Sequence, residues 1–153
     1  MKQIALLSNA AMAVFCSVLA GEIRADTEQS WYDEQAAALD SAINETHYSA
    51  VVAHTDFLVV EGDYYEERVY VADVLKTIRG QQQASIEYRV LVKPGEEALF
   101  RLDPVIVTLC YENGSYYLPT KSAQLGYEPM FLELALSQVA DFDAEQEVFA
   151  QCR

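Results

Sequence analysis

The chain has 153 residues, of which 52% are hydrophobic, and its formal net charge at pH 7 is −14. This length predicts a single domain, and the apolar content is ample for a core. The negative charge argues against nucleic acid as a partner, since phosphates require clustered Lys and Arg, and equally against anionic membrane surfaces.

The charge is unevenly distributed. Asp26–Glu67 holds eleven acidic residues and Ser122–Cys152 holds six, and neither segment contains Lys or Arg. The centre, Arg68–Lys121, is nearly neutral, with seven bases and six acids. Solvated helix faces are the simpler interpretation of the acidic flanks, and a docking surface for a basic partner or for cations is the alternative.

The first 25 residues have the pattern of a secretory signal peptide. Lys2 supplies the positive charge, and an apolar run extends from Ile4 to Leu19. Small residues permit cleavage after Ala20 or after Ala25, and the sequence does not distinguish the two.

We therefore expect a periplasmic or secreted protein in which residues 26–153 form one OB-like domain with flanking helices. The apolar run is short for a membrane span, so no span is expected. Cys16 lacks the small preceding residues of a lipoprotein cleavage site. A lipid anchor is accordingly not expected.

The domain is predicted to begin with a helix. Ser30 is a suitable N-cap for a helix over Trp31–Thr46, and Leu39 and Ile43 lie on its apolar stripe. This stripe is interpreted as a surface that faces the core.

A series of strands follows. Alternating or continuous apolar runs predict strands at Tyr48–Val60, Tyr64–Leu75, Ser85–Val92, Ala98–Leu102, Pro104–Tyr111 and Ser115–Leu118. Turns are predicted at Lys76–Gly80, at Lys93–Glu96 and, from the strongest hairpin signal, at Asn113-Gly114.

The chain is predicted to end in one or two helices. Met130–Ala140 has a helical apolar stripe, and Asp143 is placed to cap a last short helix. The whole order favours a mostly β, α+β fold: a small OB-like barrel of five or six antiparallel strands, because closure removes exposed strand edges. A curved sheet wrapped on its helices is the main alternative.

Three sequence segments together resemble a known family. The segments are AVVAHTDFLVV, YYEERVYVADVLKTIRG and VTLCYENGSYYLP, within Gln35–Pro119. They resemble secreted bacterial domains of the netrin-like type, which share an OB-like barrel with tissue inhibitors of metalloproteinases. Those inhibitors begin with a Cys-x-Cys element that chelates the protease zinc. Here no cysteine precedes Cys110 in the mature chain, so the resemblance transfers no inhibitory residue.

Two cysteines, Cys110 and Cys152, follow the signal peptide. An even number in an exported chain predicts a disulfide, interpreted as a structural staple, and two buried thiols are the alternative. The only histidines, His47 and His54, are interpreted as structural. We therefore expect no catalytic residue, metal site or cofactor.

Two tyrosine pairs, Tyr64-Tyr65 and Tyr116-Tyr117, are the candidate partner contacts. Adjacent side chains of a strand point to opposite faces, so one ring of each pair would point outward. The alternative is that tyrosine simply suits strand surfaces.

These features predict an exported, non-enzymatic module that binds an envelope or extracellular protein, or a small ligand, on a barrel face. The alternative is a small secreted enzyme, or a ligand-pocket protein with a cone-shaped, cystatin-like α+β fold. A pocket with convergent polar groups and a perturbed His54 would favour that alternative.

Overall fold

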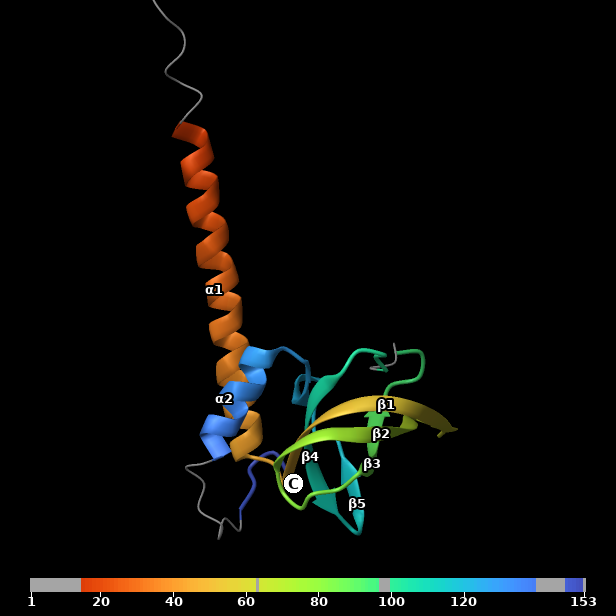
Figure 1. Cartoon of the computed structure of the whole chain (residues 1–153). Coiled ribbons are helices and arrows are strands. Elements are labelled where there is room, and N and C mark those ends of the chain that lie inside the picture. The colour runs from red at the N-terminus through yellow and green to blue at the C-terminus, as the bar shows by residue number, and fades with distance from the viewer. Residues whose placement is uncertain (1–14, 63, 97–99, 140–147, 153) are drawn as a thin grey trace, which may run out of the picture. The chain divides into compact units, whose positions relative to one another are not determined.

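A computed structural model describes residues 15–62, 64–96, 100–139 and 148–152, with side chains from residue 29 onward (Figure 1). The elements are α1 (Phe15–Asn44), β1 (Tyr48–Glu61), β2 (Glu66–Arg79), β3 (Ser85–Val92), β4 (Val105–Glu112), β5 (Ser115–Tyr117), η1 (Lys121–Ala123), β6 (Gln124–Gly126) and α2 (Pro129–Val139). The strands and α2 lie in the compact unit formed by residues 36–153. No helix among the described residues is long and apolar enough to cross a membrane.

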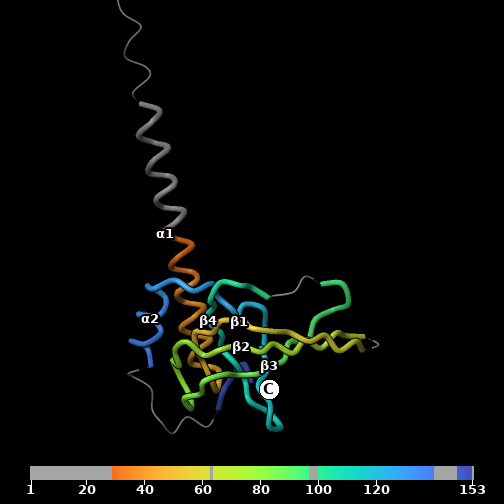
Figure 2. Tube along the Cα trace, turned by 45° about the vertical axis from the view of Figure 1, so that its right-hand side comes forward, coloured from red at the N-terminus to blue at the C-terminus, as the bar shows by residue number. Residues whose placement is uncertain are grey.

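Five strands close into a barrel in the order β1-β2-β3-β5-β4-β1, and β6 is an additional strand beside β4 (Figures 1 and 2). The predicted small barrel with flanking helices is therefore confirmed. The β3–β5 pair is parallel, whereas every other pair is antiparallel. The barrel is thus mixed, and the prediction that all its strands pair antiparallel was wrong for β3 and β5.

The barrel interior is built by alternation. Every second residue of β3 is buried, so one face of this strand packs inward and the other meets solvent. The Tyr70 and Tyr88 rings stack inside, with centroids 5.5 Å apart. Burying such side chains stabilises the fold by about 1.5–3 kcal/mol each.

The predicted first helix was wrong at its start. α1 begins at Phe15, so Ser30 lies within the helix and does not cap it. No proline separates these two residues, and the intervening segment is rich in good helix formers. Leu39 and Ile43 are buried as the stripe predicted.

The second strand is longer than predicted. Lys76 and Thr77, expected to form a turn, pair with Val51 and Ala50 of β1, and β2 runs on to Arg79. The chain turns only at Gly80, which has a φ of +94° and is therefore a position that favours glycine.

Two further predictions fall partly outside the described residues. Residues 98 and 99 of the short strand predicted before β4 are not described, and residues 100–102 are not in a strand. The predicted cap, Asp143, also lies outside the described residues, and residues 148–152 are not helical.

Candidate binding surface

The paired ends of β1 and β2 form an arm. β4 pairs with β1 only from Tyr48 to Val52, whereas the β1–β2 ladder continues to Glu61 and Glu66. The two strands therefore continue together beyond β4 (Figure 1). We call this hairpin, residues 55–71, the arm.

The strand register places a set of side chains on one side of the arm and the adjoining barrel. Leu58 lies opposite Val69, and Val69 lies opposite Arg89. Directly opposite residues share a face of the sheet, and the alternate positions Arg68 and Tyr70 are buried on the other face. We call the exposed side the outer face, which includes Leu58, Val60, Glu67, Val69, Arg89, Leu91 and Tyr117.

Large apolar side chains of the outer face are open to solvent. The exposed fractions are 62% for Leu58, 49% for Val60 and 69% for Leu91. Because these residues come from β1 and β3, the exposed apolar area crosses the sheet between the strands and is not confined to one loop. An area of this kind is a typical feature of interaction sites.

An ion pair lies within the outer face. Arg89 Nη1 and Glu67 Oε1 are 3.1 Å apart across the β2–β3 ladder, and both side chains are partly exposed. Such a pair contributes at most about 1 kcal/mol to stability. Its charged groups therefore remain accessible to a partner at small cost to the fold.

Two adjoining grooves border the outer face. A groove of about 560 Å³ runs beside β3 and the β4–β5 hairpin, and a second of about 580 Å³ shares Arg89 and Tyr116 with it. Their polar and aromatic lining residues include Glu67, Gln81, Gln83, Glu87, Tyr111, Glu112 and Tyr117.

The two predicted tyrosine pairs differ in location and in exposure to solvent. Tyr116 and Tyr117 are half-buried and line the grooves, and the Tyr116 hydroxyl accepts a hydrogen bond from Gln83 Nε2 at 3.2 Å. Tyr64 and Tyr65 lie at the turn of the arm and are 82% and 57% exposed. Both rings of this pair are exposed because they precede β2 and are not within a strand.

The sequence contains one signal for the outer face. In β3, Leu91 falls on the same face as Glu87 and Arg89, so it is an apolar residue on an otherwise polar face. Leu58 and Val60 gave no such signal, since they belong to a continuous apolar run that is equally typical of a buried strand.

His54 lies in the barrel interior and lines neither groove. Its side chain is 7% exposed and contacts the rings of Tyr70, Tyr88 and Phe100. Burial lowers the pKa of His54, and a hydrogen bond with the Arg101 carbonyl partly opposes this effect. The pKa of His54 is therefore lowered because the side chain is buried in the barrel core, and not because it lies in a polar pocket.

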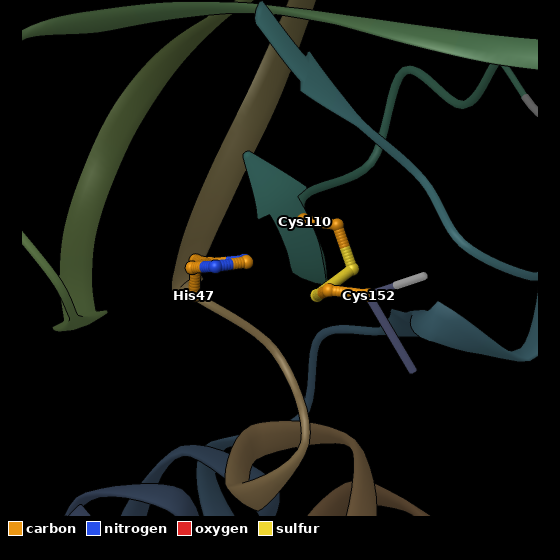
Figure 3. A group of neighbouring side chains, drawn as sticks. All are labelled: His47, Cys110 and Cys152. Carbon is orange, nitrogen blue, oxygen red and sulfur yellow. A yellow bond between two sulfur atoms is a disulfide. The ribbon is translucent and has the colours of Figure 1, made fainter. Parts of the chain in front are cut away.

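Cys110 and Cys152 form a disulfide, with His47 beside it (Figure 3). The ligand atoms of the three residues lie within 4.8 Å of one another, but both sulfurs are joined to each other and are not thiolate ligands. His47 Nδ1 instead accepts the Tyr111 N–H at 3.1 Å. Burial, followed by the charge of Arg79, lowers the His47 pKa.

Comparisons with known proteins add no identity: no protein-family model matches the chain, and a search of curated proteins finds no match. The class defined by the fold and the surface is a small mixed β-barrel in which the β1–β2 ladder extends beyond β4 and an apolar outer face is exposed. The function is therefore inferred from this geometry.

Proposed function

We propose that the chain is an exported, non-enzymatic binding module that holds a protein partner on the outer face. The observation that carries this proposal is the exposure of Leu58, Val60 and Leu91 on one side of a continuous sheet. Apolar side chains at such positions contribute little to the barrel, so their exposure is better explained by an interaction than by folding.

The exposed apolar side chains would supply part of the free energy of a specific contact. Covering one half-exposed Leu or Val stabilises a complex by about 1–2 kcal/mol, a fraction of the value for full burial. Three such residues do not by themselves offset the entropy lost on association. The neighbouring ion pair of Glu67 and Arg89 and the groove tyrosines would supply the polar rim.

A small ligand in the grooves is the second candidate. Their volumes of about 560 and 580 Å³ fall in the range of small-molecule sites. Aromatic and amide side chains, Tyr116 and Gln83 among them, are suited to a polar ligand. This candidate uses the groove residues, of which Glu67 alone belongs to the arm.

The proposal is tested by cross-linked capture from an envelope extract with variants of the full chain. Leu58→Asp combined with Leu91→Asp should abolish capture of one co-purifying protein, identified by mass spectrometry. Leu102→Asp is the matched control, since Leu102 is 85% exposed and lies outside the outer face. All three substituted positions are exposed, so the melting temperatures should agree. If the double variant captures as much of this protein as the wild type does, the proposal is overturned.

A further inference from the structure

β1 is an edge strand along the arm. Beyond Val52 it pairs with β2 on one side, and no strand within the described part of the chain pairs with its other side. The segment that leads into β4 contacts β1 through the Arg101 carbonyl at His54 and the Phe100 ring at Phe57. These contacts are not strand pairing, so among residues 64–96 and 100–139 the ladder of β1 has no partner on this side.

The hydrogen-bond register identifies the open backbone groups. The Gly62 N–H donates to the Tyr65 carbonyl at 3.0 Å. Because bonded pairs alternate along an antiparallel ladder, the backbone of Val60 then faces β2, and the backbone groups of Val59 and Glu61 face the open edge.

Asp56 supports this assignment. Its Oδ1 accepts the N–H of Phe57 at 2.8 Å, which is the next outward-facing amide along the edge. An acidic side chain in this position discourages unspecific pairing with another edge. The Asp56 carboxylate would also lie next to any strand that paired with the open edge of β1.

The charge of the arm indicates what could pair there. Its segment from Asp56 to Glu67 contains five acidic residues and neither Lys nor Arg. The same segment carries the exposed apolar residues Phe57, Leu58 and Val60. A complementary strand would combine apolar side chains with basic ones.

A second copy of the chain is a poor match for the same edge. The segment from Asp56 to Glu67 of a second copy would bring five further acidic residues and neither Lys nor Arg to this edge. Like charges brought together across a strand pair destabilise it. The net charge of −14 adds a general repulsion between copies.

We propose that the arm binds an extended, basic segment of a protein, which adds as a strand to the open edge of β1. In this mode main-chain hydrogen bonds to Val59 and Glu61 provide affinity, and the acidic and apolar side chains of the arm select the sequence. The inference rests on the proposed function, because it specifies how the partner of the outer face is held.

The probe is a labelled, end-blocked octapeptide of alternating Val and Lys. It should bind the full chain saturably in fluorescence anisotropy and slow amide exchange at Val59 and Glu61. The same peptide methylated on two adjacent central amide nitrogens keeps every side chain but loses main-chain donors. It should bind at least about tenfold more weakly, which corresponds to about 1.4 kcal/mol.

Chain variants test the same edge. Val59→Pro removes an outward-facing N–H, a change that edge strands tolerate, whereas Val59→Ala keeps it. We expect Val59→Pro to weaken peptide binding at least about tenfold and Val59→Ala to retain it. Circular dichroism and the melting temperature establish that both variants are folded.

Three results would overturn the inference. The first is equal binding of the methylated and unmethylated peptides, and the second is equal binding by Val59→Pro and Val59→Ala. The third is concentration-dependent dimerisation in sedimentation with no peptide binding, which would assign the edge to a second copy. If capture of the partner is still lost with Leu58→Asp and Leu91→Asp, the proposed function stands while strand addition fails. If capture persists, the proposed function itself fails.

Discussion

His54 Nε2 and the Tyr88 hydroxyl oxygen lie 2.6 Å apart inside the barrel. The other ring nitrogen of His54, Nδ1, lies 3.1 Å from the carbonyl oxygen of Arg101. A carbonyl only accepts hydrogen bonds, so Nδ1 carries the proton of the neutral ring and Nε2 accepts from Tyr88. The two contacts therefore fix the tautomer of His54 and join β1, β3 and the segment before β4.

Replacing Tyr88 with Phe should destabilise the barrel. The substitution leaves His54 Nε2 buried without its donor, at an expected cost of about 1–3 kcal/mol in the free energy of unfolding. Urea unfolding measures this change. Tyr64→Phe removes the same hydroxyl at an 82% exposed position and should change stability by less than about 0.5 kcal/mol. Equal effects of the two substitutions would contradict the assigned hydrogen bond.

Stability should decrease below neutral pH because of the buried histidine. The unfolded chain binds a proton at His54 near pH 6.5, whereas burial lowers the pKa of this group in the fold. The unfolded state therefore holds more protons, and stability is lost as the pH falls from about 6.5 toward the lower folded-state pKa. His47, whose pKa is also lowered, acts in the same direction.

Urea unfolding from pH 7.5 to pH 5 measures this dependence. The free energy of unfolding of His54→Phe should depend less on pH than that of the wild type, since the substitution removes one of the two histidines whose pKa is lowered in the fold. Parallel profiles would show that His54 is not the source of the lost stability.

Local patterns were sufficient for several elements of the fold. The strand Ser85–Val92 was predicted with the boundaries of β3, because strict alternation reports a face that is buried along its whole length. Asn113 and Gly114 have positive φ values of 52° and 84°, as the hairpin signal predicted. Gly95 also has a positive φ, 80°, in the predicted turn before residue 97.

The arm could not be predicted from local patterns. Ala50–Val52 and Leu58–Val60 are similar apolar runs of one strand, yet the first is buried and the second is exposed. The difference arises because β4 covers β1 only as far as Val52. The length of that non-local pairing, like the parallel β3–β5 contact, is decided by closure of the barrel and leaves no periodic signal.

Arg68 should contribute to stability through both packing and charge. Its side chain is 7% exposed, and Nη2 donates to Glu66 Oε2 at 3.0 Å and to the Glu96 carbonyl. Arg68→Ala should lower the free energy of unfolding by about 2–4 kcal/mol. Arg68→Met should lower it less, because methionine retains an apolar side chain in place of the arginine stem.

The electrostatic part of this interaction has a separate measurement. The hydrogen bond from Arg68, followed by the N–H of Gly95, lowers the pKa of the Glu66 carboxyl. In Arg68→Met the Glu66 pKa should rise toward 4.5, as followed by NMR titration. An unchanged pKa would show that the Gly95 N–H, and not the guanidinium, lowers it.

The disulfide should be a large part of the stability of the domain. Cys110 and Cys152 are separated by 42 positions, and closing a loop of this length stabilises the fold by about 4 kcal/mol on the chain-entropy estimate. The bond joins residues 148–152 to β4, and this segment also contacts the connection between α1 and β1. Gln151 N–H donates to the Glu45 carbonyl at 3.2 Å, and the Phe149 ring packs on His47 with centroids 4.1 Å apart.

Reduction should therefore lower the melting temperature by roughly 10–20 °C, as measured by calorimetry with and without a thiol reductant. It should also make residues 148–152 an early site of limited proteolysis, because the covalent link of this segment to β4 is lost. The double variant Cys110→Ser and Cys152→Ser is the control. It should melt near the reduced wild type and be insensitive to reductant. Free alkylation of both cysteines in the folded, unreduced protein would contradict the disulfide, because disulfide-bonded sulfur offers no thiolate to the reagent.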